Sequence, residues 1–241
     1  MYKIVRMLNR RKDLTPAQFK DIALKRHTAL GARAIAMAPI RKIVANFATG
    51  ESFGGAAPPF DGMLEVYFDK LGDVKEVLEG PVPGMVREGE RDFLDLERSQ
   101  AHTLTEEFLM SQKPDAEKTM KSAGQIKIVR TVYRRKDLTL QQFKDYWLTN
   151  HSKLEDRVIR ESPVTRIVAT FAVPEPGKAP DFDGMVELYF NRVDDIRAMF
   201  SGPIPAMMRS DEENFVQMDA PAIRVVAEEH LLAQRAAAKV A

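Results

Sequence analysis

One stretch of the chain occurs twice, and this repeat constrains the fold more than any other feature of the sequence. The first copy, residues 10–30, reads RRKDLTPAQFKDIALKRHTAL, and the second, residues 134–154, reads RRKDLTLQQFKDYWLTNHSKL. Their displacement divides the chain of 241 residues into two units of about the usual domain size. We therefore expect repeat 1 at residues 1–112, a linker at residues 113–124 and repeat 2 at residues 125–241.

The bulk composition excludes several classes of protein. With 44% hydrophobic and 29% charged residues, the chain has an ordinary globular composition. A net charge of +1 gives no electrostatic case for a nucleic-acid or membrane-surface partner. No apolar run reaches the roughly 18 residues of a membrane span, and the N-terminus lacks the apolar core of a signal peptide. The absence of cysteine excludes disulfides and thiolate chemistry, so we expect a cytoplasmic protein.

Each copy of the repeated stretch predicts a capped helix that carries a histidine near its end. Thr15 with Gln18, and Thr139 with Gln142, have the spacing of a capping box. Apolar residues follow at helical spacing and give one buried stripe in each copy. Prolines 39 and 163 are expected to end the two helices.

The segments around these helices predict strands. Each repeat reads β-α-β-β-α-β, with the second helical segment broken by Gly-Pro-x-Pro. This order is that of the ferredoxin-like motif, in which both helices cover one face of an antiparallel sheet. Packing the two bare sheet faces together would bury both. We therefore predict an α+β fold in which two ferredoxin-like βαββαβ repeats form an intrachain dimeric α/β barrel.

Polar residues recur inside strands that are otherwise apolar. Arg6 and Arg130 interrupt the first strand of each repeat, and Glu65 and Glu187 interrupt the third. A solvated sheet face would explain all four residues. Alternatively, they line a semi-polar pocket in which each glutamate neutralises the arginine of its own repeat.

The pattern Phe-x-x-x-(Trp)-x-x-x-His on the first helix and Asp-Gly-x-x-Glu-x-Tyr-Phe on the third strand resembles the EthD family, of the dimeric α/β-barrel superfamily. The resemblance covers nearly the whole of both repeats. It is closer in repeat 2, where Tyr146 and Trp147 stand in place of Ile22 and Ala23. It implies a ligand-sized cavity between the sheet and the first helix of each repeat, with His27 and His151 reaching toward it. Relatives in the superfamily include isomerases, cyclases and dehydratases that need no cofactor.

Histidine is suited to proton transfer near neutral pH, so His27 and His151 are the candidate catalytic residues. Other side chains are candidates for substrate binding: the arginines to stabilise a developing enolate, the glutamates to line the pocket, the tyrosines to donate to a carbonyl and the tryptophan to stack on a ring. These residues are Arg6, Arg130, Glu65, Glu187, Tyr67, Tyr189 and Trp147. Helix capping and core packing would explain the histidines and the tryptophan equally simply.

No metal motif, Gly-x-Ser-x-Gly elbow or Gly-x-Gly-x-x-Gly fingerprint is present in the sequence, so we expect neither a metal nor another cofactor. The leading hypothesis is a cofactor-independent lyase, isomerase or dehydratase that uses histidine acid–base chemistry. Its partner would be a small aromatic, lactone or polyketide-like metabolite of a catabolic pathway. One alternative is a non-catalytic binding or accessory protein of an oxidative degradation pathway. Another is an oxidoreductase of the monooxygenase or haem-handling type. A homodimer is compatible with each of these three hypotheses.

Overall fold

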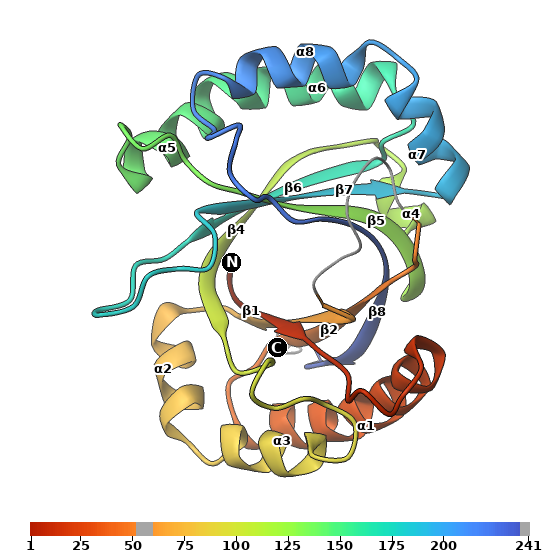
Figure 1. Cartoon of the computed structure of the whole chain (residues 1–241), viewed down its shortest axis with the longest axis vertical. Helices are drawn as coiled ribbons and strands as arrows, with labels where there is room; N and C mark the ends of the chain where they lie inside the picture. The colour runs from red at the N-terminus through yellow and green to blue at the C-terminus, as the bar shows by residue number, and fades with distance from the viewer. Residues whose placement is uncertain (52–59, 237–241) are drawn as a thin grey trace, which may run out of the picture. The chain divides into compact units, whose positions relative to one another are not determined.

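The computed structural model describes residues 1–51 and 60–236, and the element order there is the predicted one (Figure 1). The strands are β1 (Tyr2–Leu8), β2 (Lys42–Ala48), β3 (Gly62–Phe68), β4 (His102–Gln112), β5 (Ala123–Val132), β6 (Arg166–Ala172), β7 (Gly184–Phe190) and β8 (Arg224–Gln234). The helices are α1 (Pro16–Met37), α2 (Leu71–Glu79), α3 (Val82–Glu90), α4 (Ala116–Thr119), α5 (Leu140–Tyr146), the π-helical turn η1 (Trp147–His151), α6 (Ser152–Glu161), α7 (Val193–Phe200) and α8 (Ile204–Glu212). The predicted α+β class is confirmed.

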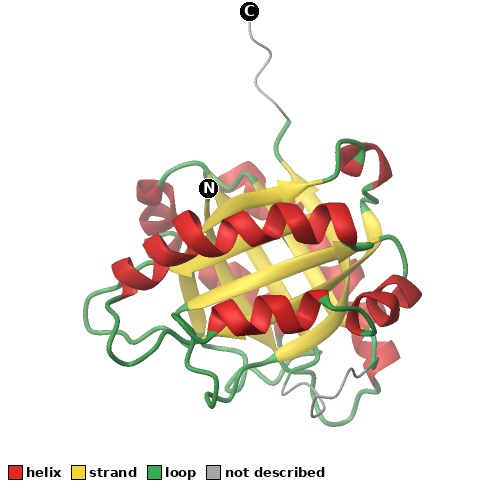
Figure 2. Ribbon diagram, turned by 90° about the horizontal axis from the view of Figure 1, so that it is seen from above, coloured by secondary structure: helices red, strands yellow, loops and turns green. Residues whose placement is uncertain are grey.

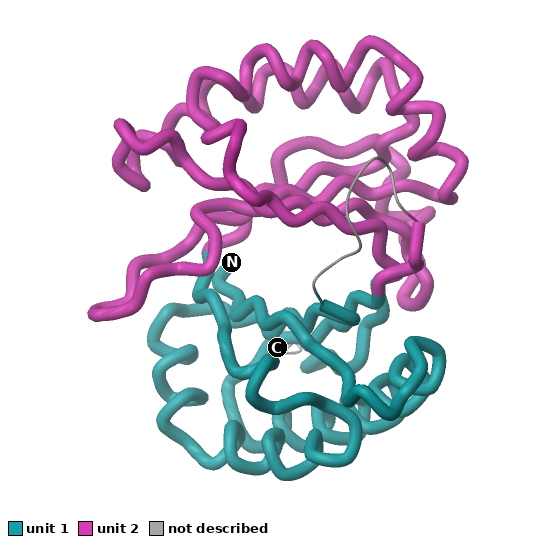
Figure 3. Tube along the Cα trace, viewed as in Figure 1, with its two compact units in different colours: residues 1–47, 59–105, 229–241 teal, residues 48–58, 106–228 magenta. Residues whose placement is uncertain are grey.

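The chain forms two compact units, shown in different colours in Figure 3. Unit 1 comprises residues 1–47, 59–105 and 229–241, and unit 2 comprises residues 48–58 and 106–228. Strands β4 and β8 each contribute residues to both units. The units therefore differ from the sequence repeats at these two strands. The stretch predicted as a linker, residues 113–124, contains the short helix α4 and the first residues of β5.

The sheet in each unit is built in the same way. In unit 1, β3 pairs antiparallel with β1 and β2, and Val66 lies opposite both Ile4 and Ile43. In unit 2, β7 pairs antiparallel with β5 and β6. The hydrogen-bonded order of these strands is therefore β1-β3-β2 in unit 1 and β5-β7-β6 in unit 2.

In each unit the helices pack against the strands of the sheet, as Figure 2 shows. The predicted capping boxes are present: Thr15 accepts a hydrogen bond from the backbone of Gln18, and Thr139 accepts one from the backbone of Gln142. In unit 2 the helices are anchored by a fully buried aromatic cluster that includes Phe143, Trp147, Phe171 and Phe215. Burying an aromatic side chain contributes about 1.5–3 kcal/mol, so this cluster fixes α5 and η1 on the sheet.

Two stretches of the sequence are rich in glycine and proline, a composition typical of exposed loops that could flank a cavity mouth. Most of the first, residues 50–59, lies outside the described residues. The second, residues 174–180, is largely exposed and does not line the cavities described below. Strand β8 ends at Gln234, and residues 237–241 lie outside the described residues. Among the helices described, none is long and apolar enough to cross a membrane.

Candidate functional site

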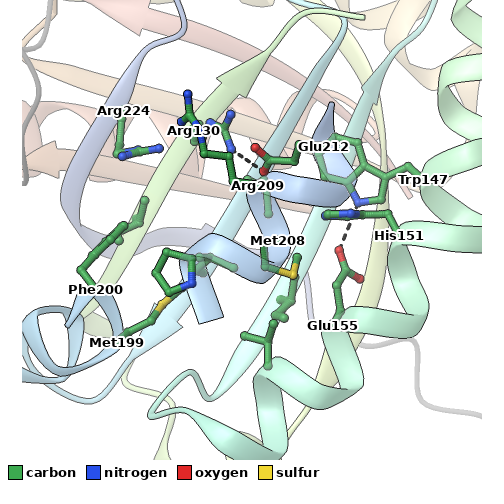
Figure 4. A pocket seen from close by; sticks show the side chains of 16 residues that line it. Arg130, Trp147, His151, Glu155, Met199, Phe200, Met208, Arg209, Glu212 and Arg224 are labelled. Atoms are coloured by element: carbon green, nitrogen blue, oxygen red, sulfur yellow. Dashed lines mark hydrogen bonds and ion pairs between the residues drawn. The ribbon is translucent and has the colours of Figure 1, made fainter. Parts of the chain in front are cut away.

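Unit 2 contains a cavity of about 170 Å³ between its sheet and its helices (Figure 4). The lining is largely apolar, with charged side chains from η1, α6, α8, β5 and β8. It consists of Ile128, Arg130, Trp147, His151, Glu155, Val158, Ile167, Val186, Leu188, Met199, Phe200, Pro205, Met208, Arg209, Glu212 and Arg224. An apolar pocket with a few convergent polar groups is the usual form of a small-molecule site.

Three of the lining residues come from one helical ridge. Trp147, His151 and Glu155 follow one another at intervals of four residues, which places them along one side of the helix. The middle of this ridge is the π-helical turn η1, whereas the equivalent helix α1 of unit 1 is α-helical throughout. Single π turns inside α-helices are frequent at functional sites because they re-aim the side chains that follow. One continuous α-helix was predicted for this stretch, and the π-helical turn corrects that prediction.

His151 is buried, and Asp211 at the end of α8 holds one of its ring nitrogens. Its Nδ1 lies 2.7 Å from Asp211 Oδ2, and Tyr146 donates its hydroxyl to Asp211 Oδ1 at 3.0 Å. Burial lowers the pKa of His151 and outweighs the opposing effect of Asp211. The imidazole is therefore largely neutral at pH 7, with Nδ1–H donating to Asp211 and Nε2 left as the basic nitrogen.

Three arginine side chains line another part of the same cavity wall (Figure 4). Arg130 on β5 forms an ion pair with Glu212 on α8 at 2.5 Å, and both side chains are mostly buried. Arg224 on β8 lies over the ring of Phe200, with 5.6 Å between its guanidinium carbon and the ring centroid. Arg209 on α8 also lines the cavity. Three guanidinium groups against the Glu212 carboxylate give this side of the cavity an excess of positive charge.

Unit 1 has a smaller counterpart, a cavity of about 120 Å³ that Arg6 and His27 line together with apolar side chains. In this cavity the side chains of Arg6 and His27 both bind the carboxylate of Glu90. Glu90 on α3 is fully buried, accepts from Arg6 Nη1 at 2.8 and 2.9 Å, and lies 2.8 Å from His27 Nε2. Arg6 Nε also donates to the carbonyl of Ser99. At the positions of Trp147 and Glu155, this unit has Ala23 and Gly31.

The strand glutamates and tyrosines lie on the sheet face opposite to these cavities. Leu64, Val66 and Phe68 line the unit 1 cavity, so Glu65 and Tyr67 point to the other face. The predicted pairing of Glu65 with Arg6 is wrong, because Glu65 forms a fully buried ion pair with Lys3 at 2.5 Å. In unit 2 the equivalent pairing of Glu187 with Arg130 is also wrong.

The partner of Glu187 is the fully buried Lys127, and Tyr189 lies beside this pair. Thus the structure brings Arg6 together with His27, and Arg130 together with His151 and Trp147. It does not bring Glu65, Glu187, Tyr67 or Tyr189 to the cavities.

Several site residues were not found from the sequence. They are Glu90, Glu155, Arg209, Asp211, Glu212 and Arg224. Glu155 carried a signal that was missed, since it lies four residues after His151 on the same helix. The acidic residues of α3 and α8 are indistinguishable in sequence from ordinary surface glutamates and aspartates.

Comparison with known proteins finds a described domain that covers part of this site. Residues 135–219, which include Trp147, His151, Glu155 and the Asp211–Glu212 pair, match the family model described as EthD domain. The resemblance inferred from the sequence motifs is thus confirmed for this part of the chain. A search of curated proteins finds no match.

Several solved structures share the fold across nearly the whole chain. An anthrone oxidase-like protein aligns over 99% of this chain and 96% of its own, with a TM-score of 0.59 and 6% identity. A protein from Fusobacterium nucleatum provisionally named a monooxygenase aligns over 96% and 92%, with a TM-score of 0.56 and 8% identity. Chlorite dismutase from Candidatus Nitrospira defluvii, solved in complex with imidazole, aligns over 94% and 90%, with a TM-score of 0.53 and 13% identity. Identities this low show a common fold alone.

Proposed function

We propose that the chain is an enzyme that moves a proton on a small, largely apolar carbonyl compound in the unit 2 cavity, without a cofactor. The observation that carries this proposal is the arrangement of His151. Its Nδ1 is anchored to Asp211, its pKa is lowered by burial, and the cavity it lines also holds the Arg130 guanidinium. The reaction class is a lyase, isomerase or dehydratase step, and the expected substrates are aromatic, lactone or polyketide-like metabolites.

The chemistry follows from these positions. Neutral His151 takes a proton from the carbon next to the carbonyl, and Asp211 stabilises the imidazolium that forms. The electron pair moves toward the carbonyl oxygen, and the arginine side chains of the cavity stabilise the negative charge that develops there. The mainly apolar lining excludes water and so strengthens these charge interactions.

Replacing His151 with glutamine is expected to slow proton exchange by about 100–10,000-fold, the usual contribution of a positioned acid–base group. Deuterium incorporation from D₂O into a panel of aromatic ketones and lactones, followed by NMR, measures this exchange. The matched control is His27→Gln. The ring of His27 faces Glu90 in the smaller cavity, so this substitution is expected to leave proton exchange unchanged. If no compound exchanges in the wild-type protein although panel members bind, the chain is instead a non-catalytic binding protein.

The excess of arginine predicts that the substrate carries an acidic group. Arg224→Met is expected to weaken the binding of benzoate by about 10–100-fold, since a hydrogen bond to a charged group contributes about 1.5–3 kcal/mol. Benzamide, similar in shape but uncharged, should bind the variant and the wild type alike. Because Trp147 lines the cavity and is the single tryptophan, its fluorescence reports both titrations. An equal loss for the two compounds would contradict the charge argument.

An oxidoreductase is the second candidate, and the anchored Nδ1 of His151 favours it. Histidines that bind metals usually donate their other ring nitrogen to a carboxylate, which leaves Nε2 for the metal. The cavity does not fit a haem, however. Its volume of about 170 Å³ is below the ~300–1,000 Å³ of pockets for drug-sized ligands. Visible absorbance of the purified protein, or a gain in absorbance on adding haemin, would favour this candidate over proton transfer.

We also propose that the two units arose as tandem ferredoxin-like repeats, since residues 10–30 and 134–154 repeat in sequence and the elements that follow recur in the same order. Two separate proposals are a cytoplasmic location and a homodimer. Sedimentation of the purified protein measures the oligomeric state.

A further inference from the structure

Glu155 is a buried acid that none of the interactions described above explains. Its side chain starts from α6, lines the unit 2 cavity and is 1% exposed. Trp147 Nε1 donates to Glu155 Oε1 at 3.1 Å, as Figure 4 shows. Glu155 Oε2 is also buried and has no hydrogen-bond partner among the described residues. A buried carboxylate with no cation beside it is costly, so the neutral acid is the favoured form.

The surroundings of Glu155 support this protonation state. Burial raises the pKa of Glu155 to about 7, with a smaller lowering by Trp147 and a further rise caused by Asp156. The ionisable groups that face the same cavity are His151 on η1, Arg130 on β5, Arg209 and Glu212 on α8, and Arg224 on β8. None of these groups forms an ion pair with Glu155 in the part of the chain that the structure describes.

We propose that Glu155 is the second proton-transfer residue of the unit 2 site and that it donates its proton to the carbonyl oxygen of the substrate. Trp147 holds one carboxyl oxygen, which leaves the other free to face a ligand. This inference rests on the proposed function, because it assigns the acid that complements the base His151.

The proton balance closes with these two residues. His151 takes a proton from carbon, the electron pair moves to the carbonyl oxygen, and Glu155 gives that oxygen its proton. The products of the step are an enol, an imidazolium and a carboxylate. In a β,γ-unsaturated carbonyl compound this enol is a dienol; return of a proton from His151 to its γ-carbon, and of the enol proton to Glu155, gives the α,β-unsaturated isomer and restores both residues.

The same reasoning assigns the activity to one unit. Unit 1 has Gly31 in place of Glu155, and a Cβ at Gly31 would already lie 3.2 Å from Ala233 Cβ and 3.3 Å from Ile43 Cδ1. No acid fits there without displacement of these neighbours. Unit 1 also keeps His27 and Arg6 bound to Glu90. Its cavity therefore lacks the acid that unit 2 provides.

The first test uses the single tryptophan as a reporter of Glu155. Fluorescence of the wild-type protein is expected to change between pH 5 and 9 with a midpoint near 7, because Trp147 donates to the titrating carboxyl group. Glu155→Gln should abolish this transition, and His151→Gln should retain it. The surface variant Glu161→Gln, on the same helix, is the matched control and should behave as the wild type. Circular dichroism of each variant establishes that it is folded.

The second test separates this inference from the proposed function. Glu155→Gln is expected to slow deuterium incorporation by about 100–10,000-fold and to remove the limb of the pH–rate profile near pH 7. If His151→Gln abolishes exchange and Glu155→Gln does not, the proposed function stands and the role of Glu155 is overturned. A wild-type fluorescence transition that persists in Glu155→Gln would also overturn it. If neither variant slows exchange, the proposed function itself fails.

Discussion

Replacing Glu90 with alanine is expected to lower the free energy of unfolding by about 3–5 kcal/mol, the usual loss when one partner of a buried ion pair is removed. Burial alone would raise the pKa of Glu90, but His27 and Arg6 together lower it by more than burial raises it. The net shift of the pKa is downward, so the carboxylate is ionised at neutral pH. Removing it leaves Arg6 without its counter-ion and His27 without its hydrogen-bond partner. Urea denaturation at pH 7 measures the loss.

The matched control for this prediction is Glu212→Ala. Glu212 occupies the equivalent place in unit 2, but its side chain is 13% exposed, and among residues 1–51 and 60–236 its ion-pair partner is Arg130. His151 keeps its own partner, Asp211. We expect a clearly smaller loss of stability, and equal losses in the two variants would contradict the assignment of Glu90 as the centre of a buried network.

Replacing Glu155 with glutamine is expected to stabilise the protein by about 3 kcal/mol at pH 8. The pKa of Glu155 rises from 4.5 to about 7 on folding. A raised folded-state pKa contributes stability below about pH 4.5, and this contribution is lost as the pH rises through about 7. Glutamine is neutral throughout and can still accept from Trp147, so the variant avoids the loss.

Urea denaturation of the variant and the wild type, from pH 4.5 to pH 8.5, measures this difference. The two proteins should have similar stability at the lower end and diverge as the pH approaches 8. Glu161→Gln on the exposed side of α6 should follow the wild type throughout. A constant difference at every pH would mean that Glu155 does not titrate on folding in the way described. A gain in stability together with a loss of proton transfer is the trade-off expected of a functional buried acid.

The local structure followed from residues close together in the chain. Thr15 and Thr139 cap their helices as predicted because a capping box needs only four consecutive residues. The alternation along β3 separates the side chains into two faces, since the strand period is two, but it did not show which face the helices cover. The duplication of residues 10–30 predicted a second copy of each element.

The ion-pair partners of the charged strand residues were not predicted correctly from the sequence. A solvated sheet face and a pairing of Glu65 with Arg6 were the two alternatives for these residues, yet Glu65 is fully buried and lies on the sheet face opposite to Arg6. The partner of Arg6 is Glu90, which lies 84 residues away in sequence and joins it only when α3 packs on the sheet. Pairings of this kind depend on packing, and no local pattern encodes them.

The prediction that His27 and His151 stand near the ends of their helices was wrong, because α1 continues from His27 to Met37 and α6 continues from Ser152 to Glu161. The sequence alone determined the repeat, the element order, the α+β class and the presence of one histidine on the first helical segment of each repeat. Those properties depend on local propensity and on hydrophobic period, which neighbouring residues establish. Only the tertiary structure decided that His27 is bound by Glu90 while His151 is held by Asp211 in a larger, cationic cavity. It also decided that Glu155 is buried, because burial and the resulting change in acidity depend on which helices and strands surround the side chain.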